Sequence, residues 1–346
     1  MPDIVFLIHG MGQFAKDWEL PVVGQLRDFC DNYSKPGKGD FDQRFQFIAI
    51  NYSLIFKDIL TTWANEKKDI EALTAQVGAD QVGKLVSWIA DENSVEKNFF
   101  WSHAFDVITY RLLPTVRDAV QVRVAAQLFD GIKDLPDGSD WSIIAHSLGT
   151  AVCHDTLQAW FTQPLAGGGT LGQRTTPYLV QMVANVSRIL QDQTNVFESD
   201  VRPGRACDFY FTQVHPLDPF TIIKTFLPTQ WPGPPHPERY YVKTLEHDFI
   251  QQANIHDLAH YLRHPDVVIP LFRCLTFNTY VTQDLEAKYR AQFKLHGNLT
   301  DPDLIALRQN LEDAGIQLPD SWTSLLTVWN RVEDLMNLAK GGLNGP

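Results

Sequence analysis

The sequence predicts an α/β protein built on a doubly wound, mostly parallel β-sheet. Two kinds of segment lead to this prediction. Short runs dominated by apolar residues are typical of parallel strands that are buried on both faces, and longer segments with helical spacing lie between them. Because strands and helices alternate, helices can serve as the crossovers between neighbouring strands, which is the arrangement of a doubly wound sheet.

Composition limits the classes of function. The chain has 346 residues, a hydrophobic fraction of 44% and a net charge of −12. The acidic excess disfavours nucleic acid and anionic membranes as partners. No apolar stretch reaches the roughly 18 residues of a membrane span, and no basic segment precedes the first apolar run, as a signal peptide requires. We therefore expect a cytoplasmic protein without integral membrane association, and its four scattered cysteines are expected to be free thiols.

The first predicted strand covers residues 3–9 and leads into the tetrapeptide HGMG at 9–12. Two glycines within three residues permit backbone conformations that other residues resist. Such a loop leaves backbone N–H groups free to face a ligand, although a plain tight turn is the alternative. A helix over 18–33 and a second strand over 45–52 are predicted next.

Residues 54–138 are many more than one crossover helix needs. Their apolar spacing is helical, and aromatic residues gather at 99–101 and at Phe105. We predict a crossover helix plus a helical, cap-like insertion close to the functional site. The alternative is a set of extra helices that pack on the sheet away from the site.

The stretch WSIIAHSLGTAVC at residues 141–153 carries the strongest functional signal. A buried strand over 141–145 turns directly into a helix over 150–161, with Ser147 at the turn and the small residues Ala145 and Gly149 on either side. This is the nucleophile-elbow pattern, in which tight packing pushes a serine out on a strained backbone. The helix N-terminus behind the serine supplies N–H groups where an oxyanion would form. A buried strand followed by an ordinary serine N-cap is the alternative.

After this helix, the glycines at 167–169 form a loop that lacks the Gly-Lys-Ser/Thr of a P-loop. We predict a helix over 177–191 and strands over 208–214 and 240–245. Asp218 lies on the loop that follows the first of these strands, where parallel sheets carry their chemistry. Its alternative role is to initiate a turn before proline.

Histidines at 256, 260 and 264 follow an i, i+4, i+8 spacing, which would place three imidazoles on one face of an unbroken helix. This invites a metal-site hypothesis, but no glutamate follows His256 as in H-E-x-x-H, and Pro265 limits the helix. We expect no metal. The C-terminal residues 276–346 have helical apolar stripes, and we expect them to pack on the domain or to mediate homo-oligomerisation.

Together HGMG, the AHSLG of residues 145–149, Asp218 and the segment 256–262 resemble the α/β-hydrolase superfamily, and esterase- and lipase-like members most of all. The resemblance runs in element order over residues 3–265. It implies an α/β-hydrolase core formed by 1–53 and 139–275, interrupted by the cap-like insertion 54–138 and followed by the helical extension 276–346. The leading strands of longer hydrolases are missing.

The resemblance implies a Ser-His-Asp triad with Ser147 as nucleophile, His256 as general base and Asp218 as the acid that orients it. It also implies an oxyanion hole made by the backbone N–H groups of Met11 and Leu148. No metal or organic cofactor is required.

Three other histidines remain eligible as the base. His256 is preferred because it precedes the helical segment 257–262 and would lie at a loop–helix junction. His260 would be held within that helix, and His247 lies close to the end of the last predicted strand. His264 is expected to have a structural role.

The implied function is that of a serine hydrolase that cleaves a small-molecule carboxylic ester through an acyl-enzyme. The first alternative is an acyltransferase that uses the same triad with an alcohol or thiol acceptor. A second alternative is a non-catalytic hydrolase-fold module that binds a protein partner.

Overall fold

The computed structural model describes residues 2–12, 14–35, 38–65, 106–107, 109–111, 113–136, 139–164, 170, 172, 175–190, 198–216, 218, 220–221, 231, 237–246, 249 and 255–296. These residues build one six-stranded sheet in the order β2-β1-β3-β4-β5-β6, and every neighbouring pair is parallel. The α/β class and the parallel sheet predicted from the sequence are therefore confirmed. The strands are β1 Asp3–Ile8, β2 Phe45–Ile50, β3 Trp141–His146, β4 Leu179–Val183, β5 Phe209–Val214 and β6 Tyr240–Thr244.

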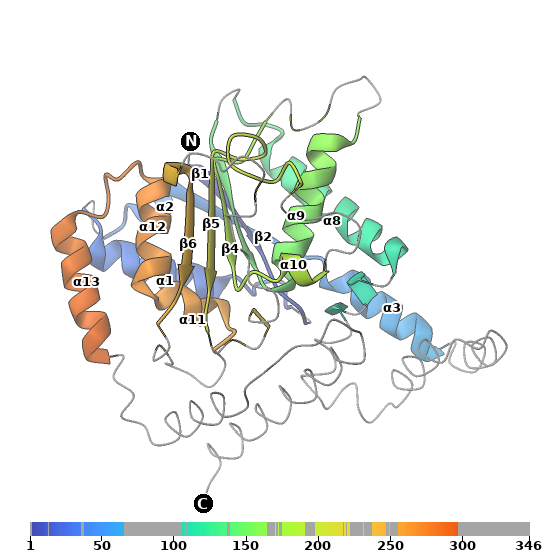
Figure 1. Ribbon diagram of the computed structural model, residues 1–346, viewed down its shortest axis with the longest axis horizontal. Helices are drawn as coiled ribbons and strands as arrows, with labels where there is room; N and C mark the ends of the chain where they lie inside the picture. Colours follow the sequence, from blue (N-terminus) through green and yellow to red (C-terminus); the bar gives the residue numbers. More distant parts are fainter. Residues whose placement is uncertain are drawn as a thin grey trace, which may run out of the picture.

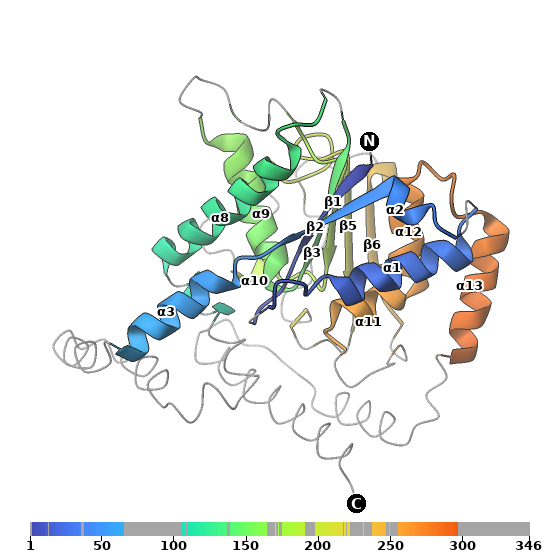
Figure 2. The ribbon, with the colours of Figure 1, turned by 180° about the vertical axis from the view of Figure 1, so that it is seen from behind.

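Helices cover both faces of the sheet (Figure 1). On one face lie α3 Ser53–Asn65, α8 Pro114–Ile132, α9 Leu148–Thr162 and the short α10 Ser187–Leu190. On the other lie α1 Leu20–Tyr33, α2 Phe41–Arg44, α11 Leu258–Arg263, α12 Pro265–Leu275 and, outermost, α13 Gln283–His296, as the reverse view also shows (Figure 2). A 3₁₀ turn, η3 Pro237–Arg239, precedes β6.

Strand β1 shows why the strands read as continuous apolar runs. Phe6 and Ile8 pack in the core on the α8–α9 face, whereas Val5 and Leu7 pack in the core on the α1–α12 face. Successive side chains of a strand point to opposite faces, so a strand covered on both sides must be apolar at every position.

The order of the strands fixes where a site can form. From β1 the chain moves outward to β2, then returns to the other side of β1 to form β3 and continues in that direction to β6. The carboxyl ends of β1 and β3 therefore flank a topological switch point, where open parallel sheets bind their ligands. The HGMG loop follows β1 and Ser147 follows β3, so both lie at this point.

One predicted element is wrong. Residues 177–191 were expected to form a helix, but they contain the central strand β4 and only one helical turn, α10. All five residues of β4 are buried, between β3 and β5. A short apolar run fits a buried strand or a buried helix equally well by periodicity. Here the run forms a strand, which pairs with β3 on one side and β5 on the other. Gln181, the polar residue in the run, donates a hydrogen bond to Gln213 Oε1 of β5 at 3.2 Å.

The residues predicted to form an insertion and a C-terminal extension are described only in part. Within 54–138, α8 packs on β1, β2 and α9 and serves as the crossover helix between β2 and β3. The segment 66–105, with its predicted aromatic cluster, and the segment 297–346 lie outside the described residues. α13 packs against α1 and α12. All four cysteines are free thiols. In the described part of the chain, no helix combines the length and apolarity that crossing a membrane requires.

Candidate active site

Ser147 lies on a strained turn between β3 and α9. Its backbone has φ 53° and ψ −127°, a region that costs a non-glycine residue about 1–3 kcal/mol. Hydrogen bonds oppose relaxation of this turn. The Ser147 N–H donates to Val183 O at 3.1 Å, and its carbonyl accepts from the N–H and hydroxyl of Thr150 at 2.8 and 2.7 Å. The strand–turn–helix geometry expected of an elbow is present.

Close backbone approach explains the small residues around the turn. A Cβ atom at Gly149 would lie 2.2 Å from His9 O and 2.7 Å from Ile8 O, so the first turn of α9 can approach the end of β1 only with glycine there. A Cβ atom at Gly10 would lie 2.9 Å from Ser147 Cβ. The HGMG loop therefore lies directly against the serine.

Three side chains from distant parts of the chain form a hydrogen-bonded series. Ser147 Oγ lies 2.6 Å from His256 Nε2, and His256 Nδ1 lies 2.7 Å from Asp218 Oδ2. An ionised carboxylate only accepts hydrogen bonds, so Nδ1 carries the proton and Nε2 is left to accept from the serine hydroxyl. His256 lies in a turn two residues before α11, at the loop–helix junction that the sequence predicts.

Asp218 is held as an anion although it is fully buried. Burial by itself would raise its pKa, but the charge and hydrogen bond of His256, together with hydrogen bonds from Tyr261 and Phe220, lower the pKa below its ordinary value. The Tyr261 hydroxyl donates to Oδ2 at 2.7 Å and the Phe220 N–H donates to Oδ1 at 3.0 Å. Tyr261 is in turn held by the N–H of His215 at 2.9 Å.

His146, which precedes the serine, supports the segment that carries His256. Its Nε2 lies 2.6 Å from the backbone oxygen of His256, to which it donates a hydrogen bond. Burial lowers the pKa of His146 to about 3, so the ring is neutral. His146 belongs to the AHSLG segment, but the sequence predicts no role for its side chain.

The amides expected to form an oxyanion hole belong to segments that meet at the serine. Leu148 is the first residue of α9, and Met11 follows Gly10, where an added Cβ atom would lie 2.9 Å from Ser147 Cβ. Neither N–H donates a hydrogen bond to another described residue. Helix N-termini and glycine-rich turns leave such donors open to a ligand anion.

A buried carboxyl group fixes the far end of the HGMG loop. Asp106 Oδ2 accepts a hydrogen bond from the N–H of Gly12 at 2.7 Å, across 94 residues of sequence. Gly12 has φ 109°, which glycine adopts readily. Burial raises the pKa of Asp106 to about 7, although the Gly12 N–H favours the ionised form.

Of the other candidate histidines, His260 and His264 are described, and neither contacts the serine. His260 is fully buried and stacks on Phe249 at 4.3 Å between ring centroids, and burial lowers its pKa to about 3. His264 caps α12 by accepting from the N–H of Asp266. His247 lies outside the described residues. Because α11 ends at Arg263 and His256 precedes it, the three histidines do not share the helix face that their spacing would give in an unbroken helix.

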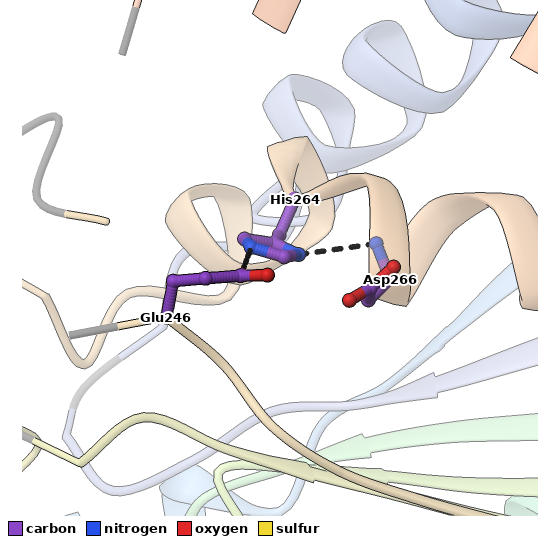
Figure 3. A group of neighbouring side chains, drawn as sticks. All are labelled: Glu246, His264 and Asp266. Atoms are coloured by element: carbon purple, nitrogen blue, oxygen red, sulfur yellow. Dashed lines mark hydrogen bonds and ion pairs between the residues drawn. The ribbon is translucent and has the colours of Figure 1, made fainter. Parts of the chain in front are cut away.

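A second group of side chains has metal-ligand chemistry: Glu246, His264 and Asp266 (Figure 3). These side chains already form ion pairs with one another or with neighbouring cations. Lys243 Nζ lies 2.7 Å from one carboxylate oxygen of Asp266, and Arg290 lies 2.6 Å from the other. His264 Nε2 lies 2.5 Å from Glu246. Two cationic side chains thus already neutralise the buried carboxylate, and an added metal ion would have to displace them.

A second serine–histidine–aspartate set lacks the features of the first. Ser199 Oγ lies 2.8 Å from His154 Nε2, and His154 Nδ1 lies 3.4 Å from Asp155. The backbone of Ser199 is not in the left-handed region, no helix begins behind it, and its hydroxyl oxygen also accepts from the N–H of Val201. This set fits a structural network on α9.

Exposure differs along the Ser147 series. Ser147 and Asp218 have no exposed surface, whereas the His256 side chain is 13% exposed.

Comparisons of the chain with models of protein families, with curated proteins and with solved structures found no match. The interpretation of the site therefore depends on its geometry and chemistry.

We predict that Asp266→Asn destabilises the protein by about 2 kcal/mol, because it removes charge-assisted hydrogen bonds from Lys243 and Arg290. These groups hold the pKa of Asp266 below its ordinary value against the effect of burial. This stabilisation is therefore present above the pKa of the unfolded chain and is lost as the pH falls through the folded pKa.

Urea unfolding of both proteins measures this effect. Asp42→Asn, which breaks the exposed pair with Arg27, is the control and should cost less than about 1 kcal/mol. A midpoint that rises on addition of zinc would contradict the ion-pair interpretation.

We predict that Asp106→Asn stabilises the protein increasingly as the pH rises. The folded pKa is about 7 and the unfolded value is about 3.9, so the folded state holds a proton that the unfolded chain has lost, and wild-type stability falls with pH across this window. Asparagine loses no proton and still accepts from Gly12. Between about pH 5.5 and 8.5, the variant should gain roughly 2 kcal/mol relative to wild type.

Chemical unfolding at the two pH values is the measurement. Asp130→Asn, at an exposed carboxylate, serves as the control and should show no such trend. A difference between Asp106→Asn and wild type that does not change with pH would contradict the raised pKa.

Proposed function

We propose that this chain is a serine hydrolase of the α/β-hydrolase type that cleaves a small-molecule carboxylic ester through an acyl-enzyme on Ser147. The observation that carries the proposal is the series Ser147–His256–Asp218, with contacts of 2.6 and 2.7 Å, on a strained serine at the switch point of a parallel sheet. A serine used only as a helix cap has no need of left-handed backbone or of a histidine held by a buried anion.

In the proposed reaction, His256 Nε2 takes the proton of the Ser147 hydroxyl while Oγ attacks the ester carbonyl carbon. The lowered pKa of Asp218 keeps it ionised, so that it stabilises the imidazolium and holds Nε2 toward the serine. The bond to the leaving alkoxide breaks as that oxygen takes the proton from His256. A water molecule, deprotonated by the same imidazole, then releases the carboxylic acid and regenerates Ser147.

Negative charge on the carbonyl oxygen would be met by the N–H groups of Met11 and Leu148. A single donor of this kind contributes roughly 3–4 kcal/mol in a well-studied protease. The proposal needs no metal or organic cofactor, because every proton transfer is assigned to a side chain.

Burial of Ser147 favours a second candidate, acyl transfer to an alcohol or thiol. A nucleophile without exposed surface is shielded from bulk water, and shielding an acyl intermediate from water is what a transferase requires. Product analysis with competing alcohols and thiols separates the two candidates, because a transferase yields the new ester or thioester in preference to the free acid.

The proposed domain organisation follows the same family pattern, with a core of 1–53 and 139–275, a cap within 54–138 and a helical extension at 276–346. α3, α8 and α13 agree with the helical content expected of the insertion and the extension. Self-association through the extension is part of this proposal and is testable by light scattering on the full chain.

We predict that a fluorophosphonate probe labels Ser147 and that Ser147→Ala abolishes both labelling and hydrolysis of short p-nitrophenyl esters, with a loss on the order of 10⁵ in kcat/KM. Peptide mapping of the labelled protein by mass spectrometry identifies the modified serine. Ser199→Ala, which alters the second serine–histidine pair, is the control and should remain active and labelled. Labelling of Ser199 instead, or no labelling of a preparation that hydrolyses the ester, would reject the assignment.

His256→Ala should lower kcat by about 10⁴ or more, because it removes the general base. His260→Ala is the comparison, since that ring lies four residues later, is fully buried and does not contact the serine. It should lower the melting temperature through lost packing and leave kcat near the wild-type value. Steady-state kinetics on the two folded variants tests this assignment of the general base. An inactive His260→Ala together with an active His256→Ala would assign the base to His260 instead.

A further inference from the structure

Tyr52 forms hydrogen bonds to the backbone of the HGMG loop. It follows β2, the strand beside β1, and its ring is 1% exposed. Its hydroxyl donates to His9 O at 2.7 Å and shares the same hydrogen with Gly10 O at 3.0 Å. A second donor, His9 Nδ1, lies 2.7 Å from Gly10 O. Two donors, the Tyr52 hydroxyl and His9 Nδ1, therefore fix the direction of the Gly10 carbonyl.

The geometry of the peptide bond carries this constraint to Met11. In a trans peptide, the C=O of one residue and the N–H of the next point in opposite directions, and the described backbone contains no cis bond. With Gly10 O directed toward Tyr52 and His9, the Met11 N–H is directed away from them. Gly10 itself lies close to the serine, since a Cβ atom added to it would lie 2.9 Å from Ser147 Cβ.

We propose that Tyr52 is a positioning residue for the oxyanion hole, which fixes the Gly10–Met11 peptide so that the Met11 N–H points at the oxygen of a substrate bound to Ser147. This inference deepens the proposed function and rests on it. Asp106, which binds the N–H of Gly12, holds the other end of the same loop, so rotation of the peptide is opposed from both ends.

Tyr52 lies in a stack of rings that a phenylalanine at this position would preserve. His9 is stacked between Tyr52 and Phe14, with centroid distances of 4.1 and 4.2 Å. Burial lowers the pKa of His9 to about 4, so the stack contains a neutral imidazole. Tyr52→Phe keeps this stack and the filled volume and removes only the hydroxyl. The Gly10 carbonyl then retains one donor, and the His9 carbonyl loses its partner.

The test compares an ester with its thionoester, in which sulfur replaces the carbonyl oxygen. Sulfur is a larger and weaker hydrogen-bond acceptor, so an enzyme that uses an oxyanion hole reacts much faster with the oxygen compound. In Tyr52→Phe, kcat for the p-nitrophenyl ester should fall about tenfold or more with little change in KM. The ratio of ester to thionoester rates should fall by a similar factor. The rate of fluorophosphonate labelling should fall as well.

Tyr210→Phe is the matched control. Tyr210 is also fully buried, and its hydroxyl accepts a hydrogen bond from Asn185 at 3.3 Å, but it lies on β5. This variant should lose thermal stability and keep both the ester rate and the ester-to-thionoester ratio. A purely structural role for Tyr52 would make the two variants behave alike.

The outcomes separate the inference from the proposed function. If wild type hydrolyses the ester and Tyr52→Phe has the same kcat and the same rate ratio, the role of Tyr52 is overturned and the hydrolase proposal stands. A wild-type protein that neither hydrolyses esters nor reacts with the fluorophosphonate overturns both. Should Tyr52→Phe prove unstable, Tyr52→Met provides a second buried variant without the hydroxyl and without added volume, and the rate ratio is again the readout.

Discussion

The close approach between the first turn of α9 and the end of β1 is the constraint on which the site depends. Gly149 lets the helix reach the backbone oxygens of Ile8 and His9, and Gly10 lets the loop after β1 reach Ser147. The serine between these contacts has φ 53°, and hydrogen bonds to Val183 and from Thr150 hold its backbone in place. The strained residue thus lies where two chain segments supply N–H groups that have no partner among the described residues.

Charge around the site is controlled by burial as much as by ion pairing. His9 and His146 are kept neutral, with pKa values of about 4 and 3, because burial disfavours their charged forms. Asp218 is equally buried, but three hydrogen-bond donors keep it ionised. The negative charge of this aspartate can then act on His256 without a competing cation on His146.

Much of the fold and the serine of the elbow follow from local sequence, whereas Asp218 and His256 were expected from the element order of the family that the chain resembles. The strands that became β1, β2, β3, β5 and β6 are marked by apolar runs bounded by turn residues, and the serine is marked by its small neighbours. β4 was missed because its short run has no local feature that excludes a helix. Tyr52, Asp106 and Tyr261 were missed for a different reason. Their partners are 42, 94 and 43 residues away in the chain, and no periodicity or spacing rule connects residues so far apart.

The buried amide pair of Gln181 and Gln213 has a consequence for how the sheet assembles. A central parallel strand has no hairpin turn to fix its alignment, and an all-apolar β4 would gain nearly the same packing after sliding along its neighbours. One hydrogen bond between two fully buried amides opposes any slip that separates Gln181 from Gln213, because each amide would then lose this partner inside the core. The pair thus helps to fix the register of β4 against β5, which the apolar pattern of β4 alone does not specify.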